Sequence, residues 1–430
     1  MKRILSIASR GVLSLIFVDG ARAQWAQIDG TENWNVYSLV TAAPSSESTL
    51  YAGTWGQGIF CTTPDGSKWI QRTTGLSNEH VTCFTVKDTN VFAGTANGIF
   101  HSTLNDTVWT PVVSGLASPH VRSLANDGYS LLAGTLERGV FRSSDNGLHW
   151  SSAGLDGKTV FALLTVGSTL YAGTSRGVFL STDTGGHWDS INTGLTDSSV
   201  YSLALCPEPG GDFLLAGTIS GAVFILHGQD TSWTSASSHL ITKCVSSLSV
   251  ITVGSGPESG EPMIFAGTWG DGVFRFFSNN GDWVPVNTGL TELWINSLCH
   301  TDSNLVAGSG TGIWCRALSE LTTSVKAVTA ELPSTLRLKQ NYPNPFSAKG
   351  GSATGGNPRT TIEFSITVSS RVSLTVYDIR GSEVSSIIDE PLSAGTYTTE
   401  WDASALPSGV YFCMLRAGRN VETRKLLLVK

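Results

Sequence analysis

One tripeptide, Ala-Gly-Thr, recurs along most of this chain and is followed within a few residues by glycine and an aliphatic–aromatic pair. The copies begin at Ala52, Ala93, Ala133, Ala172, Ala216 and Ala266, and a near-copy, Ala-Gly-Ser, begins at Ala307. A fixed spacing of about 40 residues is typical of repeat architectures, in which each repeat is one supersecondary unit. The repeat therefore constrains the fold before any single residue is considered.

Each repeat reads as four short strands. A Val/Ile-x-Ser-Leu-like strand, as at 36–39, precedes the Ala-Gly-Thr strand; a Gly-Val/Ile-Phe strand and a strand that opens on tryptophan follow. Such segments, rich in β-branched and aromatic residues and bounded by Gly, Asp, Asn and Ser, are typical of strands and turns. Four strands per repeat predict one blade of a β-propeller. The fold class is therefore all-β, with seven blades.

The two ends of the repeat region predict how the ring closes. The seventh repeat stops after Trp314 without a fourth strand, whereas residues 25–29 resemble one. We therefore expect the N-terminal strand to complete the last blade, which would remove an exposed sheet edge.

The remaining segments give the domain plan and the compartment. Residues 1–23 have the basic start, apolar stretch and Ala-x-Ala site of a signal peptide, and no other segment suits a transmembrane span. We expect the propeller over 24–318, a linker over 319–335 and a small Ig-like β-sandwich over 336–430.

The net charge of −7 and the lack of a basic face argue against a nucleic-acid partner. The seven cysteines favour buried free thiols, although a Cys299–Cys315 pair stays open.

The C-terminal module carries a series of short motifs that run to the last residue. The first comprises Tyr342, Pro343, Asn344, Pro345 and Phe346; further motifs cover 376–381, 392–397, 406–412 and 425–430. The module resembles the C-terminal sorting domain of proteins exported by the type IX secretion system of Bacteroidota, apart from a longer glycine-rich insertion at 347–358. The resemblance implies recognition by that machinery at the outer membrane, followed by secretion or attachment to the surface of a Gram-negative cell. The alternative is an Ig-like domain without a sorting role.

Two repeats contain a Ser/Thr-x-Asp-x-Gly-x-x-Trp-like turn, with Asp145 and Trp150 in one and Asp183 and Trp188 in the other. The chain thus resembles the Asp-box (BNR repeat) propellers, which include sialidases, sortilin-type receptors, xyloglucan hydrolases and a photosystem assembly factor. We interpret these four residues as structural, because the aspartate can cap turn N–H groups while the tryptophan packs between blades.

The opposite face of the ring holds the candidate binding residues. Its loops, between second and third strands and between blades, contain Trp34, Trp55, Trp269 and Trp294, with Asp271 and Glu292 beside them. Indoles on one arc could stack on sugar rings or on aromatic side chains. We expect Trp34 and Trp294 to be exposed; for Trp55 and Trp269, exposure and gap-filling between blades stay open. His80, His120, Glu137, Arg138 and Arg176 lie further round the same face.

No catalytic, metal-binding or cofactor-binding motif stands out in the sequence. The arginines show no sialidase-like triad, and a single propeller lacks the two-propeller cleft of the xyloglucan hydrolases. We therefore expect an exported binding protein for a glycan or a protein, without cofactor or metal. The alternatives are a glycoside hydrolase or sialidase-like enzyme, which requires two acids close together near the ring axis, and an assembly factor.

Overall fold

The computed structural model confirms an all-β fold. Its strands form nine four-stranded antiparallel sheets, and no α-helix is assigned in the part of the chain that is described. The described residues are 24–42, 49–62, 68–104, 106–208, 211–228, 230–236, 240, 244–252, 262–277, 281–318, 321, 326–329, 335–346, 359–367, 370–392, 395–404 and 406–429. The expected signal peptide and the glycine-rich insertion lie outside these residues.

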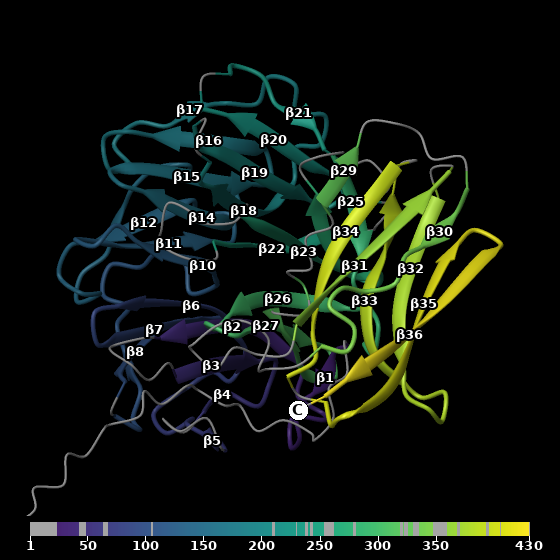
Figure 1. Ribbon diagram of the computed structural model, residues 1–430. Helices are drawn as coiled ribbons and strands as arrows, with labels where there is room; N and C mark the ends of the chain where they lie inside the picture. Colours follow the sequence, from purple (N-terminus) through teal and green to yellow (C-terminus); the bar gives the residue numbers. More distant parts are fainter. Residues whose placement is uncertain are drawn as a thin grey trace, which may run out of the picture. The chain divides into compact units, whose positions relative to one another are not determined.

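Seven of the sheets are the propeller blades, each ordered from the inner to the outer strand (Figure 1). Blades 1 to 4 are β2 (Val36–Ala42), β3 (Thr49–Thr54), β4 (Ile59–Thr62), β5 (Trp69–Gln71); β6 (Val81–Lys87), β7 (Asn90–Thr95), β8 (Gly98–Thr103), β9 (Thr110–Pro111); β10 (Val121–Asn126), β11 (Leu131–Thr135), β12 (Val140–Ser143), β13 (Ser151–Ser152); and β14 (Val160–Val166), β15 (Thr169–Thr174), β16 (Gly177–Ser181), β17 (Asp189–Ser190). Blades 5 to 7 are β18 (Val200–Cys206), β19 (Phe213–Thr218), β20 (Val223–His227), β21 (Thr234–Ser235); β22 (Val245–Ile251), β23 (Met263–Thr268), β24 (Gly272–Phe277), β25 (Asp282–Pro285); and β26 (Ile295–His300), β27 (Asn304–Ser309), β28 (Gly312–Ala317), β1 (Ala26–Gln27).

The inner strands close the ring. Each inner strand contacts the next one, from β2 through β6, β10, β14, β18 and β22 to β26, and β26 contacts β2 again. The seventh blade takes its outer strand from the other end of the sequence, because β1 pairs with β28 through Ala26↔Cys315 and Gln27↔Trp314. Ile28 adds a backbone hydrogen bond of 2.8 Å to the carbonyl of Ile313.

The glycine of each Ala-Gly-Thr repeat is the point where adjacent blades come closest. A Cβ atom built on any of these seven glycines would lie 2.5 to 2.9 Å from a methyl carbon of the Val or Ile that opens the next inner strand. For Gly308 of the last blade, that neighbour is Val36 of the first blade, at 2.6 Å. Carbon atoms cannot approach this closely, so the repeat keeps glycine because the blades pack on its bare backbone.

The tryptophan of the fourth strand links neighbouring blades. The indole N–H of Trp150 donates to the carbonyl of Val112 at 2.8 Å, and that of Trp188 donates to Ala153 at 2.7 Å. Both acceptors belong to the preceding blade, and Trp150 is buried. These indoles therefore join the blades near their outer edges.

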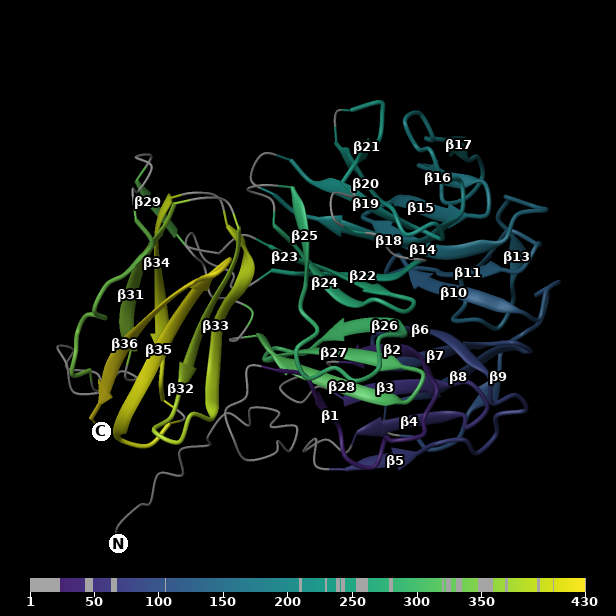
Figure 2. The same ribbon diagram turned by 90° about the vertical axis from the view of Figure 1, so that its right-hand side faces the viewer.

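The C-terminal unit is a sandwich of two sheets (Figure 2). The strand orders are β29-β34-β31-β30 and β33-β32-β35-β36. The strands are β29 (Lys326–Thr329), β30 (Arg337–Leu338), β31 (Arg359–Ile366), β32 (Ser370–Tyr377), β33 (Glu383–Leu392), β34 (Gly395–Asp402), β35 (Gly409–Ala417) and β36 (Asn420–Leu428). Their facing side chains form one buried core, which includes Phe346, Phe364 and Trp401.

The chain divides into a unit that contains Ala26–Cys315 and a unit that contains Arg316–Lys430. The segment 319–335, expected to be a linker, contains strand β29, which pairs with β34 and so belongs to the sandwich. Within the described residues, no helix is long and apolar enough to cross a membrane.

Candidate binding surface around the ring axis

A β-bulge recurs at the same place in every inner strand. The register shifts between Val36 and Ser38 in the first blade, and the same shift follows the opening Val or Ile of the other six. A bulge leaves one residue outside the ladder and re-aims its side chain. We call the seven bulged residues the axial residues: Tyr37, Thr82, Arg122, Phe161, Tyr201, Ser246 and Asn296. All seven are half-buried, and they stand at the strand ends nearest the loops that join the blades.

Four aromatic rings from four consecutive blades form a continuous stack beside this ring of residues. Phe161 stacks on Tyr201 with centroids 4.2 Å apart, and Tyr201 meets Trp269 edge to face at 5.5 Å. Trp269 in turn stacks on Trp294, with centroids 5.5 Å apart and planes inclined by 14°. Trp294 at the end of the stack is 45% exposed. The stack therefore ends in an indole whose face can meet a ligand.

A second aromatic group lies at the junction of the first two blades. Trp55 stacks on His80 at 4.4 Å and contacts Tyr37 at 5.0 Å, and it remains 39% exposed. Trp55 and Trp269 occupy equivalent positions, since each pairs with the residue just before the next inner strand. Exposure and gap-filling between blades, the two alternatives for these positions, are therefore both found. Trp269 packs largely between blades, whereas Trp55 packs on one face and is exposed on the other.

Trp34 does not join this surface, contrary to the expectation from the sequence. Its ring stacks on Phe60 of its own blade at 3.7 Å and meets Trp69 edge to face at 5.5 Å. It packs against the core between blades 7 and 1. Trp34 precedes its inner strand by one residue more than Trp294 does, and in extended chain one residue reverses the direction of the side chain.

The two candidate acids occupy the loops around Trp294. Glu292 is half-buried, and its carboxylate accepts the backbone N–H of Trp294 at 2.8 Å, so it shapes the loop that carries the indole. Asp271 is also half-buried, and its carbonyl accepts a hydrogen bond of 2.8 Å from the Asn287 amide. Both residues support this loop region.

Arg122 brings positive charge to the third blade, close to His120. Burial lowers the pKa of His120, and the nearby Arg122 guanidinium lowers it further. Burial raises the pKa of Tyr201, and the charge of Arg122 acts in the opposite direction. Tyr201 belongs to the fifth blade, so the charge of Arg122 acts on a group two blades away.

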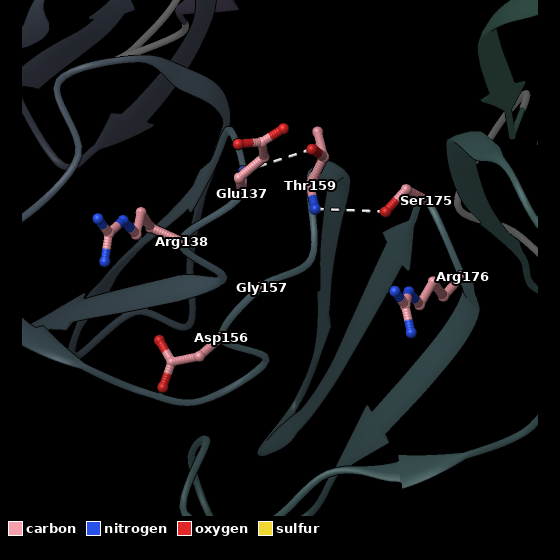
Figure 3. Close-up of a pocket in the computed structure, with 7 residues that line it drawn as sticks. All are labelled: Glu137, Arg138, Asp156, Gly157, Thr159, Ser175 and Arg176. Carbon is pink, nitrogen blue, oxygen red and sulfur yellow. Dashed lines mark hydrogen bonds between the residues drawn. The ribbon is translucent and has the colours of Figure 1, made fainter.

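A separate open pocket of about 590 Å³ lies between the third and fourth blades (Figure 3). Its lining is mixed in charge: Glu137, Arg138, Asp156, Gly157, Thr159, Ser175 and Arg176. Thr159 Oγ1 accepts the Glu137 N–H at 3.3 Å, and Ser175 Oγ accepts the Thr159 N–H at 3.4 Å. The four charged side chains are all exposed, and they make no ion pair with one another. No axial residue lines this pocket, which is remote in sequence from Trp55, Trp269 and Trp294.

The aspartates of the Asp-box-like turns lie at the opposite ends of their blades. Asp145 Oδ1 accepts the His149 N–H at 2.9 Å and the Ser143 hydroxyl at 2.8 Å. These hydrogen bonds, with that to the His149 ring, lower the pKa of Asp145 to about 2. Asp183 makes the equivalent bonds to His187 and Ser181. Both carboxylates thus hold turns in place.

The axial residues were not predicted from the sequence, although a signal was present. In the Val-x-Ser-Leu strand the flanking positions stay nearly constant, whereas x is Tyr, Thr, Arg, Phe, Tyr, Ser or Asn. A variable position inside a fixed frame indicates a side chain that the scaffold does not need. Among the described residues, no group of three or more His, Cys, Asp and Glu side chains is arranged to hold a metal ion.

Comparisons with known proteins bear on both units. Residues 356–430 match the family model of the secretion system C-terminal sorting domain. No curated protein matches the chain.

Solved structures resemble the chain in fold. The extracellular domain of BT4673 from B. thetaiotaomicron, described as part of a one-component system, aligns with a TM-score of 0.56 and 18% identity over 80% of this chain and 45% of that one. A second structure of that domain, described as part of a hybrid two-component system, gives 0.53 and 14% over 95% and 58%. PorZ, an essential surface component of the type IX secretion system of Porphyromonas gingivalis, gives 0.51 and 15% over 94% and 60%.

This chain thus spans between 45% and 60% of the length of those structures. At these identities the likeness concerns the fold alone. The family match is specific to the C-terminal unit, and it confirms the resemblance carried by the motifs from Tyr342 onward. The C-terminal part of the chain is therefore a type IX secretion sorting domain, and the protein is exported to the cell surface or secreted.

Proposed function

We propose that the propeller is a glycan-binding module displayed outside the cell, and that its ligand stacks on the aromatic rings around the axis. The observation that carries this proposal is the pair of exposed indoles, Trp55 and Trp294, each held in place by a second ring. A fixed ring loses little conformational entropy when a ligand covers it. Flat faces of sugar rings suit such surfaces, because their C–H groups pack on the indole.

The indoles can supply a useful part of the binding free energy. With 39% and 45% of their surfaces exposed, Trp55 and Trp294 offer apolar area for burial. If a ligand covers about 100 Å² on each, the gain is about 2.5 kcal/mol per ring at ~25 cal/mol per Å². Two rings would together contribute about 5 kcal/mol, which by itself corresponds to a dissociation constant of about 0.2 mM and is weakened by the costs of association.

A glycan array tests the proposal with the full mature protein. We expect binding by the wild type, and at least tenfold weaker binding by Trp55→Ala and by Trp294→Ala, with unchanged melting temperatures. Tyr129→Ala is the matched control, because Tyr129 is an 85% exposed aromatic residue in the turn between β10 and β11, on the other face of the ring. Equal losses for Tyr129→Ala, or no glycan binding at all, would contradict the proposal.

We propose no catalytic role for this surface. A retaining or inverting glycosidase needs two carboxyl groups on either side of the bond, one of them kept protonated by an apolar environment. None of the seven axial residues is acidic, and Glu137 and Asp156 of the pocket between the third and fourth blades are both exposed. Release of reducing sugar from a bound glycan would favour the hydrolase alternative. Binding to an exported partner without any glycan would favour the assembly factor.

A further inference from the structure

Arg122 differs from the other six axial residues in its contacts. Three of them donate a hydrogen bond to the next blade: Thr82 to Val121, Ser246 to Ile295 and Asn296 to Val36, at 2.6 to 2.9 Å. The other three stack on rings: Tyr37 on Trp55, and Phe161 and Tyr201 on each other.

Arg122 alone among the axial residues makes no such contact with the described part of the chain. Its Nε atom is buried without a hydrogen-bond partner. The Nε atom of Arg72, on the outer strand side of the first blade, also lacks a partner, but Arg72 Nη1 donates to the carbonyls of Leu104 at 3.2 Å and Asp106 at 2.8 Å. The Arg122 guanidinium therefore stands half-buried at the ring axis with its donors unused by its neighbours.

An unused guanidinium in such surroundings favours an anion. Arginine stays charged, carries five donors in a planar fork and matches carboxylate or phosphate groups in a bidentate geometry. Arg122 is half-buried, which lowers the local dielectric, so a charge-assisted hydrogen bond there is stronger than it would be in water. The charge of Arg122 also acts on Tyr201, where it opposes the rise in pKa that burial causes.

We propose that Arg122 selects the ligand: the axial surface binds an acidic glycan, with a carboxylate, sulfate or phosphate group on Arg122 and a neighbouring sugar ring on the aromatic residues. This inference rests on the proposed glycan-binding function and adds the charge of the ligand to it. Arg122 and the aromatic stack approach the axis from adjacent blades, since Phe161 belongs to the blade after that of Arg122. One oligosaccharide can therefore reach both.

The pocket between the third and fourth blades fits an anion less well. Its two arginines, Arg138 and Arg176, are exposed and share the lining with the carboxylates of Glu137 and Asp156. An incoming anion would meet these carboxylates, and both guanidinium groups are already solvated. Arg176 therefore serves as the matched control for Arg122: it has the same chemistry on the same face, in the next blade.

The test uses the full mature protein on an array that carries neutral glycans together with uronate-containing, sialylated, sulfated and phosphorylated ones. We expect the bound glycans to be acidic, and the four kinds of acidic glycan to distinguish a carboxylate from a sulfate or phosphate. Titration calorimetry with the strongest binder then compares variants. We expect Arg122→Gln to weaken binding by about 10- to 100-fold, Arg122→Lys to weaken it less, and Arg176→Gln to leave it unchanged. Raising the salt concentration should weaken binding by the wild type more than binding by Arg122→Gln.

Each other outcome overturns the inference. Binding of neutral glycans only would refute it and leave the proposed function standing. Acidic binding that survives Arg122→Gln and is lost in Arg176→Gln would place the anion in the pocket between blades. The absence of any glycan ligand would refute both proposals. Melting temperatures identify a variant that has lost its fold, and Arg122→Lys then replaces Arg122→Gln in the comparison.

Discussion

The contact between the repeated glycine and the next blade gives the sharpest test of how this ring is built. Gly308 lies in the last blade, and a Cβ atom on it would stand 2.6 Å from Val36 Cγ1 of the first blade. Gly308→Ala should therefore destabilise the propeller by about 1–3 kcal/mol through overpacking. Val36 is fully buried, so Val36→Ala should cost about 2 kcal/mol through lost burial and a cavity.

The double variant decides whether this contact is the cause. Removing Val36 Cγ1 leaves the new methyl group 3.2 Å from Val36 Cβ and 3.3 Å from Leu39 Cδ1, separations that small shifts can accommodate. Gly308→Ala/Val36→Ala should thus be about 1–3 kcal/mol more stable than the sum of the two single changes predicts. Gly310→Ala is the control, because a Cβ there meets no atom within 4 Å.

Urea unfolding followed by tryptophan fluorescence measures these values in the full chain, since every tryptophan except Trp401 precedes residue 316. The mechanism is refuted if the two single effects add, or if Gly308→Ala behaves like Gly310→Ala. An additive result would mean that the backbone moves aside at this glycine and that the close approach is dispensable.

Three further predictions concern other parts of the chain. The pKa of Asp145 is lowered to about 2 from 3.8, so the ionised carboxylate stabilises the fold fully above pH ~4, and this contribution is lost as the pH falls towards 2. The difference in unfolding midpoint between wild type and Asp145→Ala should therefore shrink over that pH range. A difference that stays constant would contradict this prediction. None of the seven cysteines forms a disulfide, so reductant should leave the melting temperature unchanged. Burial raises the pKa of Cys206 and Cys413 to about 12, so iodoacetamide at pH 8 should label these two only after unfolding. Deletion of 336–430 should leave the propeller in the periplasm, as cell fractionation would show. Surface display of the shortened chain would contradict the sorting role.

The repeat made the fold predictable because its period, its turn residues and its small Ala-Gly pair all report backbone geometry. Because the same glycine contact joins adjacent blades seven times, the same residues recur seven times in the sequence. The C-terminal unit was predictable for a different reason: its motifs run in order to the end of the chain. The predicted linker includes strand β29, which pairs with β34 about 70 residues later. Such long-range pairing leaves no pattern in the local sequence.

The candidate site was only partly predictable. Trp55, Trp269 and Trp294 could be found because they interrupt the repeat, but their partners Tyr37, His80 and Tyr201 could not, since stacking across blades depends on the three-dimensional ring. Alternation along a strand places successive residues on opposite faces. A bulge breaks that rule, and its one trace in the sequence is the variable position inside the nearly constant Val-x-Ser-Leu frame. Arg122 and the other axial residues were missed for this reason.

The way the last blade is assembled has a consequence for the order of events during folding. Ala26 and Cys315 pair although 289 residues separate them, so the ring cannot close until nearly the whole propeller sequence is available. Until then the blades form an open spiral whose two ends lack their partners, and joining them carries the largest loop-closure cost of any contact in the unit. We expect this final joining to be the slow phase of refolding. During that interval the unfinished propeller can be threaded through a pore or degraded by a protease, whereas a closed ring must first be pulled open.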